Sequence, residues 1–198
     1  MPKLYLMRHA ESEANRKQIL AAQLDYPLSE KGKRDAAEIA ANFKQEHTLD
    51  RIIASPLTRA VQTATPFAEL FHLQIETDVN LMEQNLGKFA GMHYEIASND
   101  PAYENDKTKR WNWVPEGGGE SYETVVGRIV RFFESMDHEI NNCNILLVSH
   151  GVTMRLIRGV LENTIPRFPH HIADNGEIWM TQFVRLNHPH VIQSLIYN

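Results

Sequence analysis

The first chemically unusual feature of the sequence is an arginine followed by a histidine at the end of a short apolar run. Residues 4–7 have the composition of a buried strand, and Arg8 and His9 follow them directly. Two neighbouring cations repel each other, so the guanidinium favours the neutral, nucleophilic form of the imidazole. A bound anion would relieve the repulsion. The pair therefore indicates either a reactive anion-binding centre or an ordinary surface pair at a strand end, and these residues alone do not decide between the two.

Four short β-rich runs can position such a pair, because each can form a core strand. They cover residues 3–7, 51–54, 74–77 and 144–149. Amphipathic patterns between them predict helices over residues 30–46 after Ser29 as N-cap, over 55–71 with Ser55 as N-cap and Pro56 at N1, over 122–140 after Ser121, and over 151–161.

This alternation predicts a three-layer α/β/α sandwich, a mainly parallel sheet with helices on both faces. Residues 177–186 and 191–197 are expected to form a hairpin at one side of the sheet. With 198 residues, 42% of them hydrophobic, a single domain over residues 1–198 is the expectation. The long stretch at 92–119, rich in aromatic and basic residues, is either a lid that recognises the substrate or a surface excursion pinned by its own aromatic rings.

Composition excludes several classes of function. A net charge of −5 argues against nucleic acid as the main partner, and no apolar run reaches the roughly 18 residues of a membrane span. The single cysteine, Cys143, excludes an intrachain disulfide, and the first residues lead into a strand rather than a secretory leader. A cytoplasmic protein is therefore expected, and nothing in the sequence indicates its oligomeric state.

Two other predicted strands are also followed by polar residues, Arg59 after the second and His150 after the last. Because the carboxyl ends of parallel strands meet at the same edge, these side chains should join Arg8 and His9 there. The helices that begin at this edge would aim their N–H groups at it, and Asn15 can donate a further hydrogen bond. The sequence thus predicts a pocket for a phosphate.

Phosphoryl transfer needs a nucleophile, stabilisation of charge on the equatorial oxygens, and an acid for the leaving oxygen. His9 can attack phosphorus to give a phosphohistidine that water then hydrolyses. The two arginines and His150 supply the stabilisation. For the acid we expect Glu83, just beyond the third strand, with a pKa that must be raised, for instance by partial burial.

The segment Arg8-His9-Ala10-Glu11 resembles the signature of the histidine phosphatase superfamily, which includes cofactor-dependent phosphoglycerate mutases and many small-molecule phosphatases. The resemblance extends over most of the chain. Its further pieces are, in order, residues 25–29 with Gly32, 54–60 with 62–64, Glu83 with Gly87 and Gly91, 118–121, and 149–151. Each piece alone is weak, whereas the ordered set is specific.

The resemblance implies a phosphoglycerate mutase-like fold and a role for each candidate residue. His9 would be the phosphorylated nucleophile and Glu83 the proton donor, with no metal or other cofactor. The phosphoryl group would be bound by Arg8, Asn15, Arg59 and His150. The implied partner is a small phosphorylated metabolite, with a phosphoprotein as an alternative.

Two departures from the family pattern matter. Ala10 stands where the signature usually has glycine, so the backbone there should avoid positive φ. Ala22-Gln23 replaces a frequent Gly-Trp pair, which puts the substrate contacts of that loop in doubt. The chain also lacks the larger insertion that mutases carry after the proton donor, and this places it with the compact phosphatases.

Several rival interpretations remain. The chain could be a phosphoglycerate mutase, or a non-catalytic module that binds phosphate or a protein. The His170-His171 pair and the histidines at 188 and 190 lack carboxylate or cysteine companions at metal-binding spacing, so no metal site is expected. Cys143 precedes a buried strand and is interpreted as a small core or edge residue. Sugar phosphates, phosphoglycerates, nucleotide-like phosphates and phosphoproteins all stay open as substrates.

Overall fold

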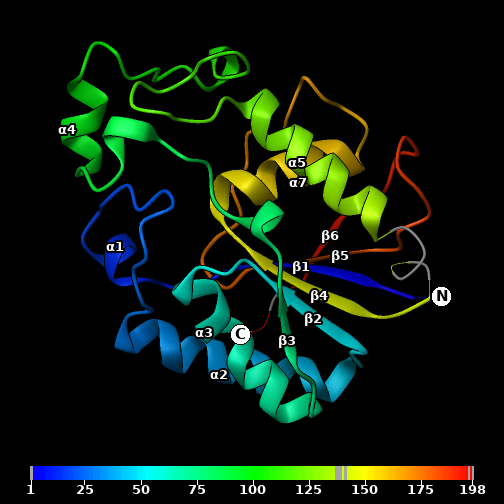
Figure 1. The fold of residues 1–198 in the computed structure, drawn as a ribbon. Helices are drawn as coiled ribbons and strands as arrows, with labels where there is room; N and C mark the ends of the chain where they lie inside the picture. Colours follow the sequence, from blue (N-terminus) through cyan, green and yellow to red (C-terminus); the bar gives the residue numbers. More distant parts are fainter. Residues whose placement is uncertain (1, 137–139, 141, 196, 198) are drawn as a thin grey trace.

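The computed structural model describes residues 2–136, 140, 142–195 and 197 (Figure 1). Within these residues one six-stranded sheet has the order β3-β2-β4-β1-β5-β6. Its strands are β1 (Leu4–Arg8), β2 (Arg51–Ala54), β3 (Ile75–Thr77), β4 (Ile145–Ser149), β5 (Ile178–Thr181) and β6 (Gln193–Leu195). β1 to β4 pair in parallel, while β5 runs antiparallel to both β1 and β6. The mainly parallel sheet and the hairpin at one side of it are confirmed.

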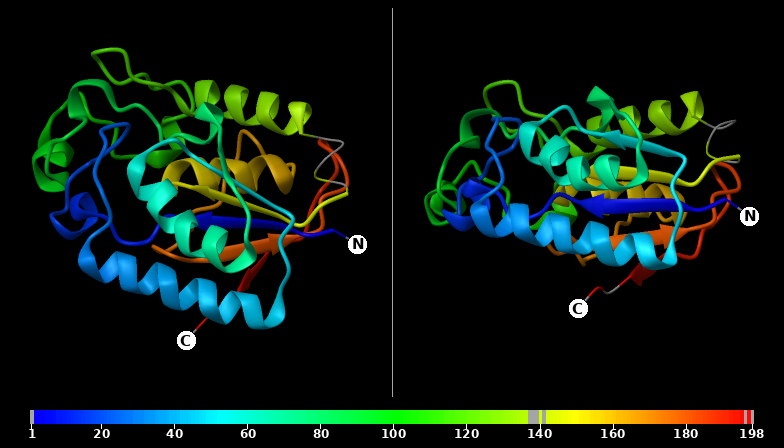
Figure 2. Two further views of the ribbon diagram at one scale, coloured as in Figure 1. Left: turned by 60° about the horizontal axis from the view of Figure 1, so that its bottom comes forward. Right: turned by 90° about the horizontal axis from the view of Figure 1, so that it is seen from below.

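Helices cover both faces of this sheet, as Figures 1 and 2 show: α2 and α3 lie on one face, α5 and α7 on the other. Among the described residues, none of these elements is both long and apolar enough to cross a membrane. The α-helices are α1 (Glu13–Arg16), α2 (Glu30–Glu46), α3 (Thr58–Phe71), α4 (Tyr94–Asn99), α5 (Tyr122–Ser135) and α7 (Gly151–Leu161), and the short 3-10 helices are η1 (Val79–Leu81), η2 (Gly87–Phe89) and η3 (Lys107–Lys109).

The core divides into two main clusters because successive side chains of a strand point to opposite faces of the sheet. From β1, Leu4 and Leu6 pack in the cluster that holds the apolar residues of α5 and α7. Tyr5 and Met7 pack in the other cluster, with the apolar faces of α2 and α3. This alternation confirms the three-layer α/β/α architecture.

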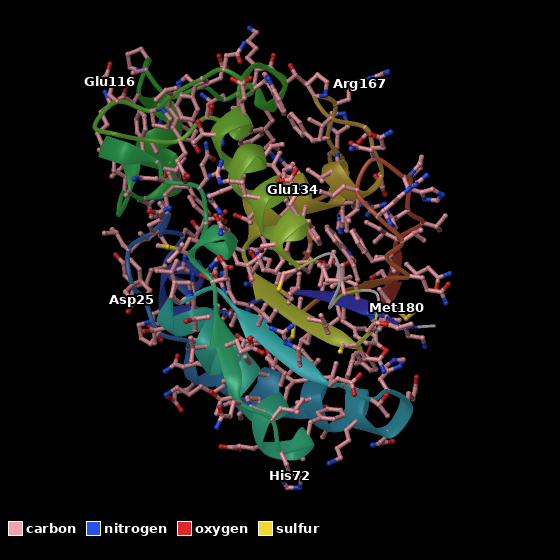
Figure 3. All side chains as sticks on the ribbon, turned by 45° about the vertical axis from the view of Figure 1, so that its right-hand side comes forward. Asp25, His72, Glu116, Glu134, Arg167 and Met180 are labelled. Carbon is pink, nitrogen blue, oxygen red and sulfur yellow. The ribbon has the colours of Figure 1, made fainter. Side chains whose placement is uncertain are left out.

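The start of α3 differs from the prediction. The helix begins at Thr58, with Leu57 at the N-cap position, so Ser55 is not its cap. Asp25 supplies the cap from a distant loop: its carboxylate accepts hydrogen bonds from the Thr58 amide and hydroxyl, both at 2.7 Å (Figure 3 labels Asp25). A tertiary contact therefore replaces the expected local one.

The end of α5 also differs. The helix ends at Ser135, with Met136 as C-cap, where the apolar pattern predicted a continuation to Ile140. Residues 137–139 of that prediction lie outside the described residues.

The first turn of α2 holds the loop that follows β1. Ser29 caps the helix by accepting from the Gly32 amide at 3.0 Å, and its hydroxyl donates to the Glu11 carboxylate at 2.6 Å. The Ser29 amide donates to the Glu11 carbonyl at 2.9 Å. A Cβ on Gly32 would lie 2.0 Å from that carbonyl oxygen, so only glycine permits this contact. The helix thereby fixes the chain immediately after His9.

Candidate active site

The six predicted site residues lie together beyond the carboxyl ends of the parallel strands. Five of them line one cavity of about 590 Å³, namely Arg8, His9, Asn15, Arg59 and Glu83. The sixth, His150, stands beside His9 with the ring centroids 5.1 Å apart. They come from β1, α1, α3, the segment after η1 and the end of β4, so the parallel topology assembles them as expected.

His9 is buried in a form that suits a nucleophile. Its Nδ1 lies 2.7 Å from the Ala10 carbonyl oxygen, and this contact requires Nδ1 to carry the proton. The lone pair is then on Nε2. Burial, followed by the charges of Arg59 and Arg8, holds the pKa of His9 well below 6.5. The neutral imidazole is therefore the resting form. As expected, Ala10 is not among the described residues with positive φ.

His150 is buried with both ring nitrogens free. Neither nitrogen has a hydrogen-bond partner within the described part of the chain. Burial is the main cause that lowers the pKa of His150 well below 6.5, and the charges of Arg59 and His9 add to it. A buried polar ring without a partner is unfavourable, so this position is suited to a ligand that supplies one.

The two arginines are anchored by backbone carbonyls rather than by carboxylates. Arg8 Nη1 donates to Ala173 O at 2.7 Å. Arg59 donates to Ala22 O at 2.7 Å and to Leu24 O at 2.9 Å, which holds the Ala22 loop, where φ is +48°. Both Nε atoms are buried without a partner in the described residues. Their charges and these free N–H groups remain available to an anion.

Asn15 is oriented as a hydrogen-bond donor. Its Oδ1 accepts from the Ser12 amide at 3.1 Å and the Ser12 hydroxyl at 2.8 Å, in a capping box at α1. Asn175 Nδ2 approaches the same oxygen at 3.2 Å and donates to the His9 carbonyl at 2.9 Å. Because donors occupy the oxygen, the Asn15 amide nitrogen is a donor, with one N–H for the side-chain hydrogen bond to Tyr94 and a second for a ligand. Asn175 was missed from the sequence, since only folding brings the tail here.

Glu83 caps the N-terminus of α7. Its carboxylate accepts hydrogen bonds from the amides of Gln84, Val152 and Thr153 at 2.9, 3.2 and 3.1 Å. The Thr153 hydroxyl lies 3.2 Å from the same carboxylate and donates to Met82 O at 2.7 Å. Since that short bond uses the hydroxyl proton, the Thr153 oxygen can accept a hydrogen bond from Glu83 when Glu83 is protonated. The site therefore accommodates both forms of the carboxyl group.

The backbone of Glu83 is held by Gln23, where the sequence departs from the family pattern, and by Arg128, which the sequence reasoning did not single out. Its carbonyl accepts from Gln23 Nε2 at 3.0 Å and from Arg128 Nη2 at 3.2 Å. Arg128 is itself paired with Glu120 at 3.0 Å. An arginine among the apolar core positions of α5 was the available signal.

The 92–119 segment forms part of the cavity wall and is also pinned by its own rings. Tyr94, Tyr103, Lys107 and Arg110 line the cavity. Trp113 packs edge to face against Tyr103, with centroids 5.6 Å apart, and its Nε1 donates to Ala102 O. The aromatic contacts fit the interpretation as a segment pinned by its own rings, while substrate recognition by a lid stays a prediction.

The side chains set aside as structural are found in structural settings. Cys143 is half-buried and packs against the α5 and α7 side of the core. His171 lies 3.2 Å from Glu177, and His190 Nδ1 contacts Leu161 O at 2.8 Å. Among the described residues, no group of three or more His, Cys, Asp or Glu side chains is placed to hold a metal ion.

The two buried histidines predict how stability depends on pH. Their folded-state pKa values are lowered from 6.5, so on acidification the unfolded chain takes up these protons first. The stabilisation is complete above about pH 6.5 and is lost as the pH falls below it, by up to about 1.4 kcal/mol per pH unit for each histidine. Urea unfolding between about pH 7.5 and about pH 5.5 measures this slope. The slope should be smaller in a His150→Gln variant, and an unchanged slope would contradict the assignment.

A family model matches nearly the whole chain: the histidine phosphatase superfamily (branch 1), over residues 4–185. Among curated proteins, phosphoserine phosphatase 1 of Hydrogenobacter thermophilus is 37% identical over 159 residues, which cover 78% of this chain and 74% of that protein. The probable phosphoglycerate mutase GpmB of Escherichia coli is 31% identical over 172 residues, covering 85% and 77%. A solved structure, a putative alpha-ribazole-5'-P phosphatase from Escherichia coli, has the same fold, with a TM-score of 0.84 at 22% identity over 98% of this chain and 95% of that one.

Proposed function

Because the chain belongs to branch 1 of the histidine phosphatase superfamily, we propose that it is a metal-independent phosphatase that hydrolyses a small phosphomonoester through a phosphohistidine on His9. The observation that supports this best is the orientation of His9, whose Nδ1 is bound to Ala10 O while its Nε2 is free at the cavity. An imidazole fixed in this tautomer, and kept neutral by burial and two arginines, is prepared for in-line attack on phosphorus.

In the first step the substrate phosphate lies between Arg8, Arg59, His150 and the Asn15 amide. The lone pair of His9 Nε2 forms the bond to phosphorus as the bond to the ester oxygen breaks. Glu83, in its protonated form, gives its proton to that oxygen, and the alcohol leaves. Thr153 can accept the hydrogen bond of this protonated carboxyl group.

In the second step a water molecule replaces the alcohol. Glu83, now a carboxylate, takes a proton from the water as the oxygen attacks phosphorus. The bond from phosphorus to His9 breaks, its electron pair returns to Nε2, and inorganic phosphate is released. The amides of Val152 and Thr153 stabilise the carboxylate between the two steps. One carboxyl group thus serves as acid and then as base.

A screen of phosphorylated metabolites, run with and without a chelator, tests the proposal. We expect release of inorganic phosphate from at least one phosphomonoester at a rate that the chelator does not change. The screen should include O-phosphoserine, because one relative is named a phosphoserine phosphatase, and phosphorylated sugars, nucleotides and proteins.

The same screen separates the rival functions. Because one relative is named a probable phosphoglycerate mutase, the screen should also include 3-phosphoglycerate together with a bisphosphate primer. Formation of 2-phosphoglycerate faster than free phosphate would show a mutase. Binding of phosphate or vanadate without any turnover would show a non-catalytic module, and inhibition by the chelator would contradict metal independence.

A further inference from the structure

One short segment beside the cavity contacts both the phosphate-binding arginine of α3 and the candidate proton donor. Ala22 and Leu24 accept hydrogen bonds from the Arg59 guanidinium through their backbone carbonyls, at 2.7 and 2.9 Å. Gln23 lies between them in the chain, and its side-chain amide nitrogen donates to the backbone carbonyl of Glu83 at 3.0 Å. Three consecutive residues thus connect the two sides of the site.

The orientation of the Gln23 amide follows from its neighbours. Its Nε2 lies 3.0 Å from the Glu83 carbonyl oxygen and 3.3 Å from a carboxylate oxygen of Glu120, and both are acceptors. The amide oxygen would be repelled at this place, so the nitrogen must face the two acceptors. The same Glu120 oxygen accepts from the Asn85 amide at 2.8 Å, and the other oxygen pairs with Arg128 at 3.0 Å. Gln23 therefore joins a mostly buried charged network beneath Glu83.

Glu83 depends on such contacts because no regular element holds it. Residues 83–86 form neither helix nor strand, so side-chain hydrogen bonds fix the backbone there. Within the described residues, the Glu83 carbonyl accepts only from Gln23 and from Arg128, the latter at 3.2 Å. Ala21 and Ala22 line the cavity, whereas Gln23 does not. Gln23 can therefore act on the reaction only through the residues that it holds.

We propose that Gln23 is a positioning residue of the hydrolysis, which holds the proton donor Glu83 at a fixed place relative to the phosphate bound by Arg59. This inference rests on the proposed phosphatase activity. Proton transfer needs the carboxyl group within about 2.6–3.2 Å of the ester oxygen, and a displacement of about 1 Å can lower a rate about 100-fold. The tryptophan frequent at this position in the family has a single N–H for the two acceptors that Gln23 contacts.

The Gln23→Leu variant removes the amide and keeps a side chain of similar size. We expect kcat for alkyl phosphates to fall about 10- to 100-fold, because the proton donor is no longer fixed. The single-turnover release of p-nitrophenol from p-nitrophenyl phosphate should stay within about twofold of wild type, because p-nitrophenolate leaves without protonation. Vanadate should bind as in the wild type, since backbone carbonyls hold Arg59 in either variant.

Two further variants and a double variant sharpen this test. Gln23→Glu should lower kcat for alkyl phosphates more than Gln23→Leu does, because its carboxylate would face two acceptors. In a Glu83→Gln background, Gln23→Leu should cause less than about a twofold further loss, because it acts through Glu83. Gln45→Leu is the matched control: Gln45 is exposed on α2 and does not line the cavity, so this variant should match the wild type throughout.

The possible outcomes separate this inference from the proposed function. An unchanged kcat of Gln23→Leu for alkyl phosphates would overturn the positioning role. An equal loss of p-nitrophenol release or of vanadate binding would also overturn it, because it would show a general structural effect, and so would a full additional loss in the Glu83→Gln background. Absence of alkyl phosphate turnover by the wild-type protein would instead contradict the proposed function.

Discussion

Substitution of His9 by alanine should lower phosphate release by at least about 10⁴-fold, because the two-step route loses its nucleophile. The same change should abolish covalent labelling of the protein by a substrate carrying radioactive phosphate. Binding of vanadate should persist, since Arg8, Arg59 and His150 remain. Within the described residues the His9 ring makes one hydrogen bond, to Ala10 O, so the fold should tolerate its loss. Rapid-quench labelling, steady-state kinetics and vanadate binding together measure these outcomes.

His188→Ala is the matched control for this experiment. His188 is exposed and lies in the tail away from the cavity, so the variant should keep wild-type turnover and labelling. If His9→Ala retained activity within about tenfold of wild type, or still became labelled, another group would be the nucleophile and the mechanism would be wrong.

The fold could be predicted from the sequence where local patterns decide the structure. The strand predicted at residues 144–149 contains a continuous apolar run at 145–148, and β4 is buried over its whole length. The start of α3 could not be predicted, because Asp25 caps it from 33 positions earlier in the chain. The preference for serine at a helix N-cap predicted that Ser55 caps α3, but the helix begins later, at Thr58. Helix boundaries that depend on tertiary contacts cannot be predicted from local sequence patterns.

The site could be predicted in outline because one topological rule brings the strand ends together. That rule places Arg59 and His150 beside His9 without any knowledge of side-chain packing. It does not reveal how each group is oriented. The free nitrogen of His9 depends on the Ala10 carbonyl, and the donor orientation of Asn15 depends on Ser12 and on Asn175 from the distant tail. These contacts require the folded structure.

The Glu83→Gln variant should distinguish a proton donor from a structural cap. Glutamine has nearly the same shape, and its carbonyl oxygen can still accept from the Gln84 and Thr153 amides, so the fold should be kept although the Val152 amide loses its acceptor. It cannot donate a proton to an alkoxide. We therefore expect kcat for alkyl phosphates to fall about 10²- to 10⁴-fold. The effect on the first step with p-nitrophenyl phosphate should be small, because p-nitrophenolate leaves without protonation.

The second step makes this test sharper, because attack by water also needs Glu83 as a base. With p-nitrophenyl phosphate the variant should release a rapid burst of p-nitrophenol equal to the enzyme present, and then turn over slowly while the phosphoenzyme accumulates. With an alkyl phosphate it should show no burst. An equal loss on both substrates, without a burst, would mean that Glu83 only caps α7. Thr153→Val should show the same pattern more weakly, and Thr153→Ser should restore activity, because the hydroxyl holds Glu83 when it is protonated.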